Sequence, residues 1–290
     1  MQKQTRGILL LVLLLGTQAF SGVYRDLYKR LASELQVSLQ DQSRLEQWLE
    51  TRDCKSPKTE LSIQCLRDRI YGDAAIVFDT ITTRAMVDLM PEHLLQSHKG
   101  ACVSISFLAL LLAERSGIAV QVISVPGHVF LRFSGNENWE SNRSGYRYRD
   151  EEYLAKYSIS AEQLKPLTPK QFEGVFRYEL GNRSAASGDA VVASRFYMQA
   201  YGLWQDPSVA GNWALLLEKM GQRQKAISIL DRLWQQGVRS EDLVWNKALM
   251  MLRAEQPATQ VLAFLQSARE ASIVSARLMD LDMRIRKSQE

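Results

Sequence analysis

Residues 99–117 read KGACVSISFLALLLAERSG, a stretch in which one cysteine directly precedes an apolar run. From Cys102 to Ala113 the stretch is apolar nearly all round, which is typical of a buried helix, and it is shorter than a membrane span. Gly117 follows as an expected helix C-cap. The sequence therefore predicts a central buried helix that begins at a cysteine. Cys102 is either a nucleophile at the start of this helix or a small core residue that happens to be a thiol.

Short segments after this helix predict a small antiparallel sheet. AVQVISV, GHVFLRF and NWES are rich in β-branched and aromatic residues and are separated by turn signals. Before the central helix, leucines recur at helical spacing from Val23 to Glu50, and a second helical stretch is expected from Leu61 to Leu89, ended by Met90-Pro91. Helices that precede and pack on such a sheet form an α+β fold.

The periodicity in the last part of the chain predicts helices only. Turn residues predict breaks at Gly188, Asp206-Pro207, Gly221, Gly237 and Pro257. Gly188 and Gly221 are 33 residues apart (221 − 188 = 33), and the same spacing separates two alanines that are each followed by a bulky residue. This spacing resembles the tetratricopeptide repeat, a helical hairpin of about 34 residues. An irregular helical bundle is the alternative. We expect an α+β domain over residues 22–165 and helical repeats over residues 166–290.

The amino terminus has the pattern of a secretory signal peptide, assigned to residues 1–21. Lys3 and Arg6 precede a short apolar run from Gly7 to Leu15, and small residues suited to signal peptidase follow. An uncleaved membrane anchor is the weaker alternative, because a spanning helix needs about 20 apolar residues. We therefore expect an exported protein that is soluble and has no membrane span after processing.

Export changes the interpretation of the three cysteines, because an oxidising compartment allows disulfides to form. Cys54 and Cys65 bracket the turn-like segment KSPKTELSIQ and are the natural pair. Closing so short a loop contributes on the order of 3 kcal/mol to stability. Cys102 is then the free thiol.

Composition, charge and motif content indicate which classes of ligand the protein is expected to bind. The hydrophobic fraction of 46% and the charged fraction of 23% are typical of a soluble globular protein. The net charge of +4 is spread along the chain without basic runs, so we expect no nucleic-acid partner. Because no Cys, His and carboxylate cluster has zinc-site spacing and no glycine-rich phosphate loop is present, we expect no metal and no nucleotide cofactor.

The predicted start of the central helix favours the thiolate that a cysteine nucleophile needs, because the positive end of the helix dipole lies there. An imidazolium is the other source of such activation, and the chain has three histidines. His93 and His98 lie in the polar segment PEHLLQSHKG and are candidates for surface residues. His128 opens the strand HVFLRF, which is expected beside the helix, and is the better candidate for the base.

An imidazole that acts as a base needs a third group to hold its ring. Asn138 and Glu140 lie on the next predicted strand, two residues apart and therefore on one face. Glu140 is preferred because its carboxylate offers a charge to the imidazolium. The amide of Asn138 is the alternative third member.

These residues lie within the run KGACVSISFLALLLAERSGIAVQVISVPGHVFLRF, followed by NWESNRSGYRYRDEEYLAKYSIS, which resembles the bacterial transglutaminase-like core family with carboxyl-terminal tetratricopeptide-like repeats. The resemblance covers roughly Leu61 to Leu167 and implies a papain-type core. It implies that Cys102 is the nucleophile, His128 the base and Glu140 the acidic third member. Trp139 stands where the motif of the family usually has an aliphatic residue.

Two hypotheses of function follow. The first is a cysteine-type amidohydrolase or acyltransferase, exported to the bacterial periplasm, that acts on a peptide or protein amide, with cell-wall peptide as the first substrate to test. The residues leave open whether water or an amine resolves the thioester. The second is a non-catalytic scaffold whose helical repeats bind a protein partner or a peptide.

Overall fold

The computed structural model describes residues 22–56, 59–79, 85–134 and 137–289. The predicted signal peptide, residues 1–21, lies outside the described residues. The chain divides into two compact units, Met1–Pro169 and Lys170–Glu290. Within the described ranges, none of the helices has the length and apolar character needed to cross a membrane.

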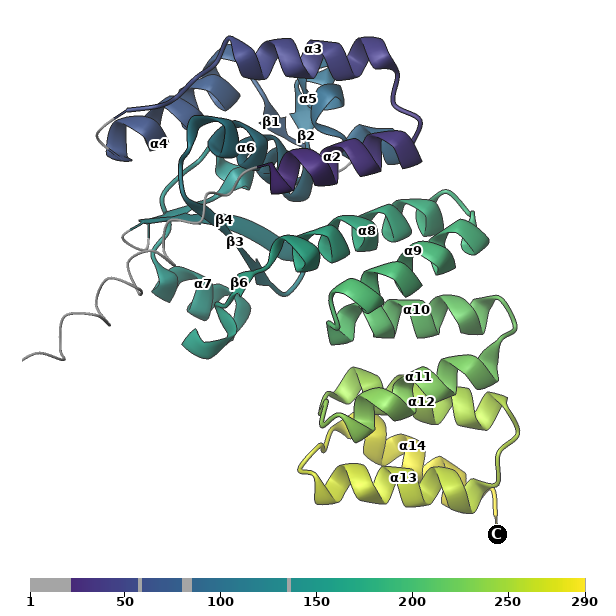
Figure 1. Ribbon diagram of the computed structural model, residues 1–290. Helices are drawn as coiled ribbons and strands as arrows, with labels where there is room; N and C mark the ends of the chain where they lie inside the picture. Colours follow the sequence, from purple (N-terminus) through teal and green to yellow (C-terminus); the bar gives the residue numbers. More distant parts are fainter. Residues whose placement is uncertain (1–21, 57–58, 80–84, 135–136, 290) are drawn as a thin grey trace, which may run out of the picture. The chain divides into compact units, whose positions relative to one another are not determined.

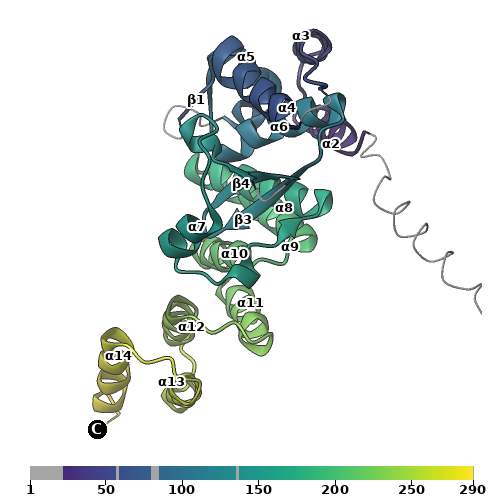
Figure 2. The same cartoon turned by 90° about the vertical axis from the view of Figure 1, so that its left-hand side faces the viewer.

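The first unit is an α+β domain, as the sequence predicted (Figure 1). In both views α2–α6 lie on one side of the strands β3 and β4, and α7 lies on the other side (Figure 2). The helices of this unit are α2 (Val23–Glu34), α3 (Leu39–Glu50), α4 (Thr59–Arg67), α5 (Pro91–Ser97), α6 (Cys102–Ser116) and α7 (Asp150–Tyr157).

A four-stranded antiparallel sheet follows α6. Its strands are β3 (Val120–Val125), β4 (His128–Phe133), β5 (Glu137–Trp139) and β6 (Pro166–Leu167). The order is β5-β4-β3-β6, and the β3–β4 hairpin pairs Val125 with His128 and Val120 with Phe133. The three predicted strands and their antiparallel pairing are therefore confirmed, and the hairpin places His128 at the start of β4.

The predicted central helix is α6, and it forms the core of this unit. Its side chains are buried on nearly every face, from Val103 through Ala113. It contacts helices α2, α3, α4 and α5 and strands β3 and β4. Gly117 ends the helix with φ 66°, a left-handed conformation that glycine adopts without steric cost.

The expectation of one helical stretch from Leu61 to Leu89 is wrong. Helix α4 passes into a π-helical turn at Asp68–Asp73, and the chain then enters the short strand β1 (Val77–Phe78). This strand pairs in parallel with β2 (Lys99–Gly100), immediately before α6. The polar YGDAA segment interrupts the apolar spacing, and pairing with a strand distant in sequence outweighs local helical preference.

The second unit is entirely helical in its described residues. Figure 1 shows successive helices stacked side by side, and Figure 2 shows several of them nearly end-on. The predicted breaks at Gly188, Gly221 and Gly237 fall between helices, each with positive φ. The helices are α8 (Pro169–Ala186), α9 (Ala190–Leu203), α10 (Pro207–Lys219), α11 (Arg223–Gln235), α12 (Glu241–Arg253), α13 (Ala258–Glu270) and α14 (Ala276–Lys287).

The predicted disulfide between Cys54 and Cys65 is present, with the two Cα atoms 5.5 Å apart. The backbone N–H of Cys54 also donates to the hydroxyl of Ser116, at 3.0 Å. The disulfide therefore joins α4 to the segment before it, and that segment is bonded to the end of α6.

Replacing both disulfide cysteines by serine is expected to lower the free energy of unfolding by about 2–3 kcal/mol, because the bridge no longer restricts the unfolded chain. Urea unfolding of the oxidised wild type, the reduced wild type and the double variant measures the change. Equal midpoints for all three would show that the bridge adds no stability.

Candidate active site

Cys102 is the first residue of α6, so the amino-terminal end of that helix lies at its thiol. It is the free cysteine of the described chain and is partly exposed. The first-turn N–H groups of a helix carry partial positive charge and favour an anion nearby. The position is therefore suited to a nucleophilic thiolate.

Gly100 allows the chain to approach α6 closely just before Cys102. A β-carbon at this position would lie 2.9 Å from a methyl group of Leu94 and 3.0 Å from the hydroxyl of Ser104. That hydroxyl donates to the carbonyl oxygen of Ala101, at 2.9 Å. Strand β2 and the first turn of α6 are thus packed directly against each other, and this packing holds Cys102 in place.

The imidazole of His128 and the carboxylate of Glu140 form a buried pair. Nε2 of His128 lies 2.9 Å from each carboxylate oxygen of Glu140. The two side chains are 5% and 2% exposed, so solvent screens their interaction little. Because Nε2 is engaged by Glu140, Nδ1 is the ring nitrogen left for Cys102, as in the usual arrangement of nucleophile, base and orienting acid.

Two further groups donate to the Glu140 carboxylate, and a backbone hydrogen bond holds the residue. The backbone N–H of Asn142 donates to Oε1 at 3.0 Å, and the hydroxyl of Tyr153 donates to Oε2 at 3.1 Å. The backbone N–H of Glu140 donates to the carbonyl oxygen of Tyr146 at 2.9 Å. A carboxylate with several donors stays ionised when buried. Glu140 can therefore fix both the orientation and the charge of His128.

The electrostatics of the pair favour an imidazolium beside a carboxylate. Burial lowers the pKa of His128, but hydrogen bonding to Cys102 and Glu140 and their negative charges outweigh it and raise the pKa to about 9. Burial raises the pKa of the Glu140 carboxyl, but the hydrogen bond and charge of His128, with help from Asn142 and Tyr153, hold it below its ordinary value. Cys102, His128 and Glu140 thus act on one another electrostatically.

An aromatic stack from α7 and β4 covers the imidazole. The rings of Tyr157 and His128 are nearly parallel, with centroids 6.3 Å apart and an interplanar angle of 12°. The ring of Tyr153 stacks on Phe130 with centroids 3.8 Å apart. Burial and the charges of Glu140 and Cys102 raise the pKa of the Tyr157 phenol to about 12, so it stays a neutral hydrogen-bond donor.

Asn138, the alternative third member, is not beside His128. Its Oδ1 accepts from Nε of Arg132 at 2.8 Å, and its Nδ2 donates to Oδ1 of Asp150 at 2.6 Å. Arg132 also donates to Asp150, at 2.5 Å. Because Asp150 is the first residue of α7, this network ties that helix to the sheet and supports the tyrosines that contact His128 and Glu140.

The other two histidines have partners elsewhere. Nε2 of His93 lies 3.2 Å from the carboxylate of Asp88, and Nδ1 of His98 lies 2.7 Å from the carbonyl oxygen of Ala74. Across the described residues, no group of His, Cys, Asp and Glu side chains is arranged to hold a metal ion.

Sequence reasoning missed Asn142, Tyr153 and Tyr157. The two tyrosines are four residues apart on α7 and so share a face of a polar helix, a signal that was present in DEEYLAKY. Asn142 follows Glu140 by two residues, the spacing at which a side-chain oxygen bonds a backbone N–H.

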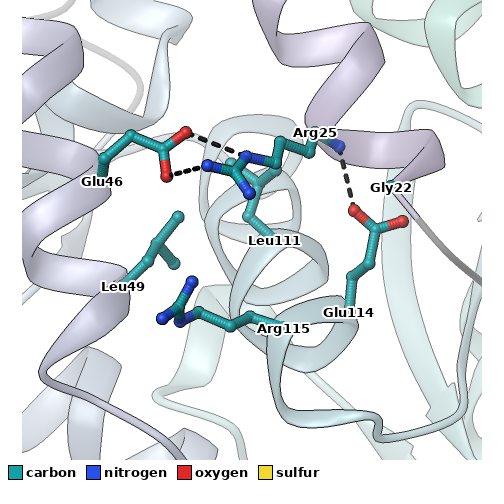
Figure 3. A pocket seen from close by; sticks show the side chains of 7 residues that line it. All are labelled: Gly22, Arg25, Glu46, Leu49, Leu111, Glu114 and Arg115. Carbon is teal, nitrogen blue, oxygen red and sulfur yellow. Dashed lines mark hydrogen bonds and ion pairs between the residues drawn. The ribbon is translucent and has the colours of Figure 1, made fainter.

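A cavity of about 260 Å³ lies at the other end of α6 from Cys102. Figure 3 shows Arg25 of α2 directed toward Glu46 of α3, with which it makes two hydrogen bonds. Glu114 of α6 accepts from the backbone N–H groups of Tyr24 and Arg25 at the start of α2. The polar groups of this cavity therefore tie α2 to its neighbours, and the cavity is separate from the candidate active site.

A family model described as the transglutaminase-like superfamily matches residues 13–171, which include Cys102, His128 and Glu140. The match covers more than half of the chain. No curated protein matches it.

Proposed function

The chain belongs to the transglutaminase-like superfamily, and we propose that it is a cysteine-dependent acyl-transfer enzyme that acts on an amide of a peptide or protein. The observation that carries the proposal is the buried His128–Glu140 pair next to a cysteine that begins a helix. Hydrolysis and transfer to an amine share the first half of this reaction. Cell-wall peptide is the first substrate to test.

The proposed reaction uses each member of the triad in turn. The Cys102 thiolate adds to the carbonyl carbon, and the π electrons of the carbonyl move to its oxygen. When the carbonyl re-forms, the C–N bond breaks and His128 gives its proton to the leaving nitrogen, which produces a thioester. Water or an amine then attacks the thioester, and His128 takes the proton of the nucleophile. The C–S bond breaks, the acyl product is released, and Cys102 leaves as the thiolate. Glu140 holds the ring and stabilises its charge throughout.

Alkylation of Cys102 by iodoacetamide tests the coupling of thiol and imidazole. An ordinary thiol with a pKa of about 8.5 is only a few per cent thiolate at pH 7. Wild-type Cys102 is expected to react on the order of tenfold faster than the same cysteine in His128→Ala, because the imidazolium favours the thiolate. Mass spectrometry of the Cys102 peptide, at a series of pH values, measures both rates.

His93→Ala is the matched control, because His93 contacts Asp88 and not Cys102. It is expected to leave the alkylation rate unchanged. Equal rates in wild type and His128→Ala at every pH would remove the main support for an enzyme.

We propose peptide or protein binding by the helical unit as a second function, which does not require the first. A cavity of about 320 Å³ lies among α10, α11 and α12, lined by Asn212, Leu215, Leu233 and Asn246 among others. Apolar side chains together with asparagine, serine and Asp242 offer a peptide both packing and hydrogen bonds. Fluorescence titration with a peptide library tests this function, with Leu215→Arg as the variant expected to lose binding and Cys102→Ser as the variant expected to keep it.

We also propose that the protein is exported to an oxidising compartment, the bacterial periplasm, after removal of residues 1–21. The Cys54–Cys65 disulfide supports this proposal because such bonds persist outside reducing compartments. Amino-terminal sequencing of the protein from cell fractions tests it. A mature protein that still begins at Met1 would contradict the proposal.

A further inference from the structure

Asn142 lies beside the nitrogen of His128 that is left for Cys102. It belongs to the short 3-10 helix Ser141–Arg143, which contacts α6. Its Nδ2 is 3.3 Å from Nδ1 of His128. The backbone N–H of Asn142 is bonded to Glu140, so the position of the residue is fixed from the carboxylate side of the pair. The carboxamide is therefore held at the reacting end of the imidazole.

The hydrogen-bonding capacity of this carboxamide is largely unused. Its Oδ1 is buried and has no hydrogen-bond partner, and its contact with Nδ1 is longer than the usual 2.7–3.2 Å of a nitrogen donor bond. A carboxamide has two N–H donors and an acceptor oxygen, and buried polar groups normally find partners. The buried oxygen can only accept a hydrogen bond, but Nδ2 carries two N–H groups and makes this one long contact, so its donor capacity is available to a ligand.

The protonated His128 cannot accept a hydrogen bond from the amide N–H groups of Asn142. The neutral imidazole can accept a hydrogen bond at Nδ1, but the imidazolium carries a proton on both nitrogens and accepts none. Nδ2 of Asn142 then needs another acceptor. The oxyanion that forms when the Cys102 thiolate adds to a carbonyl is such an acceptor.

We propose that the carboxamide of Asn142 donates a hydrogen bond to the oxyanion formed on Cys102, as a catalytic residue alongside the backbone N–H groups at the start of α6. The inference rests on the proposed acyl-transfer function. Asn142 would then affect only those reactions of Cys102 that pass through a tetrahedral oxyanion.

Two reagents separate this role from an effect on the thiol. In acylation by p-nitrophenyl acetate, the thiolate adds to the ester carbonyl, an oxyanion forms, and the carbonyl re-forms as p-nitrophenolate leaves. In alkylation by iodoacetamide, the thiolate displaces iodide from carbon and no oxyanion forms. Loss of an oxyanion donor lowers rates by about 10²–10³-fold, so it should affect the first reaction and spare the second.

The experiment measures both rates at Cys102 by mass spectrometry in the full chain. Asn142→Ala is expected to lower the acylation rate by about 10²-fold and to leave the alkylation rate nearly unchanged. Asn142→Asp has almost the same shape but no N–H donor, and is expected to lower acylation as well. Asn182→Ala, which changes a partly buried asparagine of α8, is the control expected to leave both rates unchanged.

Each result has a definite meaning. Unchanged acylation in both Asn142 variants overturns the inference while leaving the proposed function intact. An equal fall in acylation and alkylation also overturns it, because Asn142 would then act only through His128. If wild-type Cys102 is not acylated but the disulfide and fold are intact, the proposed function fails, and the inference fails with it.

Discussion

Glu140→Ala is expected to lower the free energy of unfolding by about 3–5 kcal/mol. The carboxylate is buried, pairs with His128, and accepts from the Asn142 backbone and the Tyr153 hydroxyl. Without the carboxylate, the imidazolium and these two donors have no hydrogen-bond partner in a low-dielectric site. Each buried group without a partner carries a desolvation cost. Hydrogen exchange of the β4 amides measures the loss within the amino-terminal unit.

Glu137→Ala is the matched control, three residues earlier in the chain. Glu137 pairs with Arg147, whose side chain is 54% exposed, so its loss should cost no more than about 1 kcal/mol. The loss of unfolding free energy in Glu140→Gln is expected to lie between those of Glu140→Ala and Glu137→Ala. The amide keeps the size of the side chain and one acceptor oxygen. Similar losses in Glu140→Ala and Glu137→Ala would contradict the assignment of a buried, coupled pair.

The stability that protonated His128 contributes is expected to fall by about 3 kcal/mol as the pH rises from about 6.5 to about 9. The pKa of His128 is raised from 6.5 to about 9 in the folded protein. Between these values His128 holds a proton in the folded state that it has released in the unfolded chain, so the stability that His128 contributes falls as the pH rises. The contribution of the pair is complete below the unfolded pKa and is lost as the pH passes through the folded pKa.

Two variants identify the source of this pH dependence. His128→Ala lacks the titrating group, and its stability should change little across the same interval. Cys102→Ser removes the contribution of Cys102 to the raised pKa of His128 but keeps Glu140, so the stability contributed by His128 should begin to fall at a lower pH than in wild type. On the acid side, Glu140 has a lowered pKa, so its contribution is present above about 4.5 and is lost as the pH falls. Urea midpoints at a series of pH values measure these changes. A wild-type profile that matches His128→Ala would contradict the raised pKa.

Much of the fold is readable from local patterns. The apolar run that became α6, the glycine that ends it, and the β-branched segments of β3 and β4 each follow from side chains near in sequence. The expected helix from Leu61 to Leu89 was wrong because β1 pairs with β2, a strand about twenty residues away. No local pattern reports such a pairing.

The identities of Cys102, His128 and Glu140 followed from residue chemistry and from strand and helix periodicity. The same periodicity placed Asn138 and Glu140 on one face and left both as candidates. Tertiary structure separates them, because Arg132 and Asp150 engage the Asn138 amide while His128 contacts the Glu140 carboxylate. The sequence by itself determined the candidate groups, because the reactivity of a thiol, an imidazole or a carboxylate follows from residue type. Their distances depend on how α7 and the turn after β5 pack on the sheet, and that packing is set by burial across distant parts of the chain.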